Sequence, residues 1–286
     1  MDLAARGAVM TGEVATRSRV RIGRGAVLLL ALVALAIGAP WFGLPETGAP
    51  GLPPLGLSGA EALHPLGTDP GGTDLTLRVA AALSVTILVV GAALAGQVLL
   101  CLLLVLAGAA LRPLRWGISG LARVMHAVSL PFLALAGLLL AEAMEVLPAS
   151  GWPRLAFVTI ALILAGWPRG VMEMNRMLER VRQAPHVRAA REIRLPPHRL
   201  WLRHMLPGTN GAMRRAAPLI AVETLAAALA IGFLRPAEDL PNLGGMIAQT
   251  AADLPMDWTP FLVASIAAGL LLLALAMLSG ESETGP

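Results

Sequence analysis

The sequence predicts an all-α membrane protein: a polytopic bundle of six transmembrane helices with a basic elbow on its cytoplasmic side. Of the 286 residues, 56% are hydrophobic and only 14% are charged. A soluble domain of this size could not bury so much apolar surface, so the composition indicates a membrane protein. Two further observations support this prediction. Six apolar runs follow one another along the chain, and the arginines are distributed unevenly between them.

The apolar runs place the helices. We expect a cytoplasmic tail over residues 1–24, a first transmembrane helix over 25–44 and an outer loop over 45–77. We expect the first helix to be retained and not cleaved as a signal peptide, because Trp41 and Phe42 extend its apolar run. A core of five helices follows over 78–280, and a second cytoplasmic tail covers 281–286. The five core spans are predicted at 79–111, 117–144, 155–172, 216–234 and 259–278.

The arginines set the orientation. The chain has 22 basic residues, all of them arginine, and 19 of these fall in segments that the six spans place on one side. Only Arg78, Arg154 and Arg235 fall on the other side. Because basic residues accumulate on the cytoplasmic side of membrane proteins, both termini are predicted to be cytoplasmic. The same rule accounts for the net charge of +4 without nucleic-acid binding.

The segment 175–215 between the fourth and fifth spans carries ten of the arginines. Pro196 and Pro197 interrupt it, and Pro197 suits the first turn of a second helix. Apolar residues recur at helical spacing on both sides of the interruption, as Val187, Ala190 and Ile193 and then as Leu200, Trp201 and Met205. The pattern predicts two short amphipathic helices at a bend, a cytoplasmic elbow that docks a partner.

Few residues suggest chemistry, and no phosphate-binding loop or catalytic motif is present, so the chain is not expected to be an enzyme. Glu223 lies about two turns into the fifth span, where it could face a substrate pathway or pair with an arginine of a partner subunit. Glu142 and Glu173 lie near span ends, where a carboxylate can extend to the membrane surface. Gln97 and Thr159 are expected to form hydrogen bonds between helices.

The outer segment 64–74 is rich in turn-forming residues. Asp69 and Asp74 can accept hydrogen bonds from nearby backbone amides, and Asp74 stands where it would cap the next helix. Two carboxylates are too few for a calcium site. The lone Cys101 permits no intrachain disulfide, and no metal site is expected from the spacing of the elbow histidines, His186, His198 and His204.

The outer segment reads His-Pro-Leu-Gly-Thr-Asp over 64–69, followed by Gly72 and Asp74. This run resembles the HPFGTDxxGRD signature that precedes the second helix in one family, the permeases of peptide/nickel-type ABC importers. The signature residues are His64, Gly67, Asp69, Gly72 and Asp74. Further along, residues 232–234 and 243–246 resemble the family's SFLG and SWGxM segments, in the same order.

The elbow resembles the cytoplasmic EAA loop of importer permeases, with residues 203–207 similar to the usual RHILP. The resemblance implies that this segment couples to an ATPase through Arg188, Ala189, Ala190, Arg191, Arg194, Arg199, Leu206 and Pro207. The chain also departs from the family: arginine replaces the Glu of EAA at 188, the following Gly at 194 and the Gly after Phe-Leu at 235. Thr73 and Ala228 replace an Arg and a Glu.

The resemblance is closest to the dipeptide/oligopeptide C-type permease subunit of the bacterial inner membrane. It implies a heterodimer with a second permease, two ATPase subunits that bind ATP and Mg, and an extracytoplasmic substrate-binding protein. This chain itself is expected to bind no cofactor. Three alternatives stay open: a degenerate permease that scaffolds or regulates such an assembly, a secondary transporter, and a membrane-embedded enzyme. The substrate class, whether peptides, nickel chelates or other small solutes, also stays open.

Overall fold

The structure, a computed structural model, describes residues 23–38, 56–58, 62–69, 71–148, 151–183, 187, 206–236, 240–252 and 258–279. The described part is all-helical apart from one small antiparallel hairpin, in which β1 (Gly56–Ser58) pairs with β2 (Ala62–His64). A first helix covers Gly23–Gly38. The others are α2 (Leu75–Ala110), α3 (Arg112–His126), α4 (Leu130–Ala143), α5 (Gly151–Gln183), α8 (Leu206–Leu234), α9 (Leu243–Ala252) and α10 (Thr259–Ser279).

Four described helices are long and apolar enough to cross a membrane by length and composition: Leu75–Gly108, Gly151–Val181, Ala216–Leu234 and Thr259–Ser279. These four correspond to the predicted second, fourth, fifth and sixth spans, so the chain has the helices of a membrane protein. The number rises to five if the bent pair α3 and α4 counts as one span. The helix Gly23–Gly38 is shorter than the roughly 20 residues that a span requires. Six spans are therefore not established.

The predicted third span, 117–144, is not one straight helix. It consists of α3 and α4, which meet at an angle of 97°. The break covers residues 127–129, and Pro131 stands within the first turn of α4. Proline lacks the N–H that would continue α3 and is favoured in the first turn of a new helix, so the helix restarts in another direction. The prediction joined the amphipathic end of α3, which carries Arg123 and His126, to the apolar α4 as one span.

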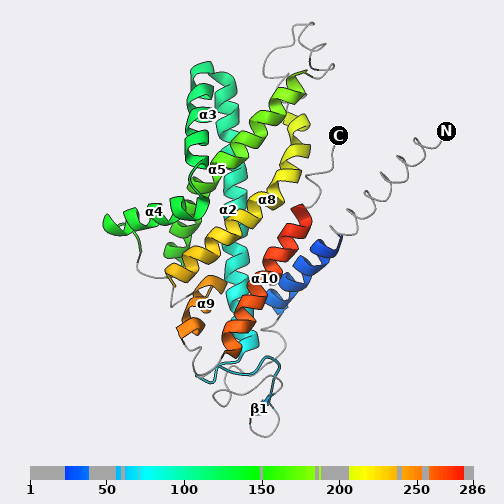
Figure 1. Ribbon diagram of the computed structural model, residues 1–286, viewed down its shortest axis with the longest axis vertical. Helices are drawn as coiled ribbons and strands as arrows, with labels where there is room; N and C mark the ends of the chain where they lie inside the picture. The colour runs from blue at the N-terminus through cyan, green and yellow to red at the C-terminus, as the bar shows by residue number, and fades with distance from the viewer. Residues whose placement is uncertain are drawn as a thin grey trace, which may run out of the picture.

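The long helices form a bundle around α2 (Figure 1). Helix α5 packs against α2, α3, α4 and α8, while α10 packs against α2, α8 and α9. The hairpin lies at the end of the bundle where α2 begins, and α9 lies toward the same end; we call it the hairpin end. The C-terminal end of α5 and the first turns of α8 lie at the opposite end (Figure 1). The predicted elbow joins these two helices, and its residues 184–186 and 188–205 lie outside the described part of the chain.

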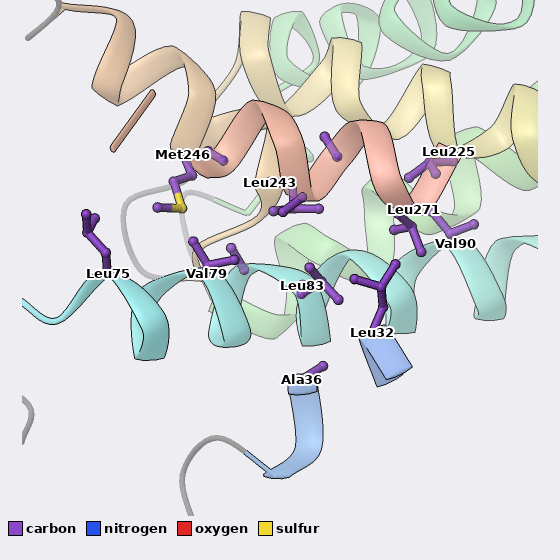
Figure 2. Packing of buried hydrophobic residues seen from close by; sticks show 14 residues of the cluster. Leu32, Ala36, Leu75, Val79, Leu83, Val90, Leu225, Leu243, Met246 and Leu271 are labelled. Carbon is purple, nitrogen blue, oxygen red and sulfur yellow. The ribbon is translucent and has the colours of Figure 1, made fainter. Parts of the chain in front are cut away.

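The largest apolar cluster joins α2 to the helix Gly23–Gly38, α8, α9 and α10. Leu83 of α2, Leu225 of α8 and Leu243 of α9 are fully buried in it, and Leu32 extends into it from the first helix (Figure 2). The cluster holds helices far apart in sequence against the half of α2 that begins at Leu75. It thereby fixes the surroundings of the loop that precedes α2.

Glycines bring α2 and α5 into close contact. A Cβ atom at Gly166 would overlap the side chain of Gln97, and one at Gly170 would overlap Cys101. The approach allows the Gln97 amide to donate to the carbonyl of Leu162 in α5 (2.9 Å), while its oxygen accepts from Thr224 in α8 (3.2 Å). Small residues and interhelical hydrogen bonds of this kind join helices within membranes. The prediction that Gln97 bonds between helices is confirmed, whereas Thr159 donates to Leu155 of its own helix.

Candidate functional site

The five signature residues of the outer loop form one connected structure at the start of α2. Asp74 and His64 are both fully buried, and the His64 Nδ1 lies 2.6 Å from Asp74 Oδ2. A carboxylate only accepts hydrogen bonds, so the ring nitrogen donates. The other carboxylate oxygen accepts from the backbone amides of Thr76 and Leu77, which confirms Asp74 as the N-cap of α2. One side chain thus joins the hairpin to the helix.

Asp69 makes a second set of contacts in the same loop. Its Oδ1 accepts from the backbone amide of Thr73 at 2.8 Å, and its Oδ2 lies 2.5 Å from Nη1 of Arg78. The other nitrogen of that guanidinium, Nη2, donates to Gln249 of α9 at 2.9 Å. Asp69 therefore fixes the turn and connects it, through Arg78, to a helix 171 residues further along the chain. Arg78 and Gln249 could not be predicted as partners from the sequence, because their contact depends on how α9 packs.

The two signature glycines occupy backbone positions that other residues adopt at a cost. Gly67 has φ of 82° and Gly72 has φ of 81°, both in the left-handed region. The chain turns at Gly67, and the Gly67 carbonyl accepts a hydrogen bond from the amide of Leu75. The amide of Gly72 donates to the carbonyl of Asp69. The glycines allow the loop to fold back on the start of α2, where Asp74 and His64 meet.

Two further segments of the predicted resemblance meet close to this loop. A Cβ at Gly232, in α8, would overlap Asn242, and one at Gly244, in α9, would overlap the carbonyl of Leu229. The amide of Leu243 donates to the hydroxyl of Thr86 in α2, and Met246 packs in the same apolar cluster as Leu75 (Figure 2). Gly232 therefore packs on the turn at 242–245, and segment 243–246 in turn contacts the first part of α2.

Asn242 caps this turn, although it was not among the residues predicted from the sequence. Its Oδ1 accepts from the amide of Gly245 at 2.8 Å, three residues on. An asparagine directly before an apolar segment is a common N-terminal cap, so the pattern of residues 242–245 contained the signal.

The predicted pathway residue Glu223 forms an ion pair with Arg169 of the same chain, from α5. The alternative in which Glu223 pairs with an arginine of another subunit is not needed to account for its charge in this structure. The exposed fractions of the two side chains are 26% for Arg169 and 38% for Glu223, so neither is sealed in the protein. In the sequence, Arg169 was counted only among the 19 arginines assigned to the cytoplasmic side and its flanks. The structure places it inside α5, which continues to Gln183.

The ion pair lies at the wall of a cavity of about 310 Å³. The cavity is bounded by the break between α3 and α4, by α5 around Pro168 and by α8. Its polar side chains are His126, Ser129, Arg169 and Glu223, and the remaining lining is apolar or glycine. The cavity thus combines both signs of charge with an apolar surface, which is the composition of a site for a small polar solute.

The two other predicted membrane carboxylates form exposed ion pairs. Glu142 of α4 lies 2.9 Å from Arg235, and Glu173 lies 2.9 Å from Arg176 one turn away in α5. Arg235 is the residue that replaces the glycine of the family segment after Phe-Leu. Because Arg235 pairs with Glu142, the arginine at this position has an ionic partner at the end of α8.

Most of the predicted ATPase-coupling residues, namely Arg188, Ala189, Ala190, Arg191, Arg194 and Arg199, lie outside the described residues. Val187 is described and buried, and Leu206 and Pro207 belong to the first turn of α8. Within the described ranges, no group of three or more His, Cys, Asp or Glu side chains could hold a metal ion. No protein-family model matches the sequence, and no curated protein matches it.

Proposed function

We propose that the chain is a permease subunit of an ATP-driven importer, which forms half of the translocation pathway for peptides or similar small solutes. In this proposal it pairs with a second permease in the bacterial inner membrane, with both termini in the cytoplasm. Separate ATPase subunits bind ATP and Mg and dock on the elbow. A substrate-binding protein delivers the solute from outside.

The observation that carries the proposal is the arrangement of the resembling segments. Residues 64–74, 232–234 and 243–246 are far apart in the sequence. Yet the first and third segments both contact the first half of α2, and Gly232 packs on the turn at 242–245. Within the first of them, His64, Asp69 and Asp74 use their side chains in hydrogen bonds that shape the loop. A chance similarity of separate short motifs would not be expected to bring them together in space.

The positions of the helix ends also support the proposal. The C-terminal end of α5 and the first turns of α8, between which the arginine-rich segment falls in the sequence, lie at the end of the bundle opposite the hairpin (Figure 1). An importer needs its solute entrance and its ATPase contact on opposite faces of the membrane. An ATP-driven movement of the elbow would then be transmitted along α5 and α8, the two helices that carry the Arg169–Glu223 pair.

The test is co-purification in a mild detergent of the full chain expressed with its native gene neighbours. We expect an ATPase and a second permease to purify with it in stoichiometric amounts. Substitution of Arg188, Arg191 and Arg199 by serine should remove the ATPase. Substitution of Arg17, Arg19 and Arg21 by serine removes the same charge from the N-terminal tail and should leave the assembly intact.

Other outcomes would assign other functions. A chain that purifies alone would contradict the importer assembly and favour a secondary transporter. An assembly that forms, but in which no solute stimulates ATP hydrolysis, would favour a degenerate permease with a scaffolding or regulatory role. That second outcome has a specific basis in the sequence, because Arg188 and Arg194 replace the glutamate and the glycine of the family's coupling loop.

A further inference from the structure

We propose that the Arg169–Glu223 cavity is a binding site for a small zwitterion, a solute that carries one ammonium and one carboxylate group. This inference rests on the proposed function, because it names the solute contact within the pathway of that permease. Glu223 would bind the ammonium group and Arg169 would bind the carboxylate. The protein's own ion pair would thus be exchanged for two pairs with the solute.

The location of the pair supports a role in binding. Arg169 lies within the candidate span Gly151–Val181, and Glu223 lies about two turns inside the span Ala216–Leu234. Charged side chains within spans are costly, and they usually mark a pathway or a ligand site. A pair that only held α5 to α8 would be expected to be enclosed by its neighbours. This pair is partly exposed at the wall of a cavity of about 310 Å³.

The surroundings of the pair are fixed before any solute binds. Gln97 of α2 bonds to Leu162 on α5 and to Thr224 on α8, next to Glu223 in the sequence. Gly166, which also lines the cavity, allows this contact because a side chain there would overlap Gln97. The three helices are therefore held together beside the part of the cavity wall that Gly166 forms. A site built on such a rigid framework loses little entropy when a solute binds.

The chemistry of the pair selects the class of solute. A neutral solute offers nothing to replace the attraction between Arg169 and Glu223. A solute with a single charge would bind one of them and leave the other without a partner within a span, which is unfavourable. A zwitterion binds both charged side chains at once and so offsets the free energy that is needed to separate them. Every other class of solute should therefore bind less tightly. The volume is near the lower limit of about 300 Å³ for small-molecule pockets, which favours a compact solute.

The test measures equilibrium binding to the purified full-length chain in lipid nanodiscs. Three probes carry different charged groups: alanyl-alanine has both, its N-acetyl derivative lacks the ammonium group, and its C-terminal amide lacks the carboxylate. The wild type should bind alanyl-alanine about tenfold or more tightly than either blocked probe, the effect of one charge-assisted hydrogen bond. Glu223→Gln should abolish the preference over the N-acetyl probe, and Arg169→Gln should abolish the preference over the amide.

The exchange variant Arg169→Glu/Glu223→Arg separates binding from structure. It keeps an ion pair between α5 and α8, and it should restore the preference for the zwitterion in the reversed orientation. The matched control, Glu142→Gln with Arg235→Gln, removes an ion pair outside this cavity and should leave all three affinities unchanged.

Equal binding of the three probes by the wild type, or no binding of any of them, would overturn the proposal. So would an equal loss for all three probes in each single variant, which is the result expected of a purely structural ion pair. Binding is measured without the ATPase, so it is independent of the co-purification experiment. A failure of the zwitterion site can therefore be distinguished from a failure of the importer assembly.

Discussion

The loop at the hairpin end and the cavity beside α5 and α8 each contain an acidic residue paired with a basic one, but the two pairs differ in burial. His64 and Asp74 are completely buried, and Asp74 also caps α2 with its second oxygen. Arg169 and Glu223 are partly exposed next to a cavity of about 310 Å³. A buried group whose hydrogen bonds are all satisfied has no capacity for a ligand, whereas a partly exposed pair can exchange partners. The loop is therefore suited to a structural role, and the cavity is suited to the binding role that we propose for it.

The largest effect on stability should come from removing the Asp74 side chain. This substitution tests whether the loop has a structural role. Asp74→Ala leaves His64 buried without its partner and removes the N-cap of α2. We expect the free energy of unfolding to fall by about 3 kcal/mol, since loss of one partner of a buried pair typically costs this much. SDS titration of the protein in mixed micelles measures the change.

Ser84→Ala provides the control for this variant. The Ser84 hydroxyl lies on the same helix and donates an exposed hydrogen bond to the carbonyl of Ala81. The free energy of unfolding should therefore change by less than about 0.5 kcal/mol. If Asp74→Ala were no more harmful than Ser84→Ala, the loop would not be a structural element, and its polar groups would be available for a ligand instead.

A smaller effect is expected where α9 packs on α8. In Gly244→Ala, the added methyl group would overlap the backbone carbonyl of Leu229, which cannot move aside as a flexible side chain would. Overpacking of this kind costs about 1–3 kcal/mol. The same SDS titration measures it, and the loss should fall below that of Asp74→Ala.

Gly269→Ala is the matched substitution for Gly244→Ala. Gly269 is also helical, in α10, and nothing lies within 4 Å of the position of an added Cβ. Because alanine favours a helix more than glycine does, we expect no loss of stability there. Similar losses at both positions would mean that the close approach of α8 and α9 is not what fixes the hairpin end.

The sequence predicted those parts of the two regions that depend on local pattern. Asp74 was predicted as a cap because an N-cap is recognised from its neighbours along the chain. Glu223 was predicted as a pathway candidate because a carboxylate inside an apolar run is unusual. Pro131 was a local signal for the break between α3 and α4, but residues 117–144 were interpreted as one span.

The remaining parts depend on tertiary packing, which no local pattern contains. Arg169 and Glu223 are 54 positions apart and meet only because α5 and α8 pack together. Arg78 and Gln249 meet because α9 folds back toward the start of α2. The cavity could not be predicted either, since it exists only where the α3–α4 break faces Pro168 of α5.

The smallest effect is expected at Gln97, and it tests whether the cavity region is held less tightly than the hairpin end. Gln97→Leu removes the hydrogen bonds to Leu162 and Thr224, but the Thr224 hydroxyl keeps its bond to the carbonyl of Ile220. Since interhelical hydrogen bonds in membranes contribute about 0.6 kcal/mol on average, we expect a loss of about 1 kcal/mol. Thr159→Val, which removes a hydroxyl bonded within its own helix, should change less. A loss of stability as large as that of Asp74→Ala would mean that the cavity region is held as tightly as the loop. The two regions would then differ only in how deeply their charged pairs are buried.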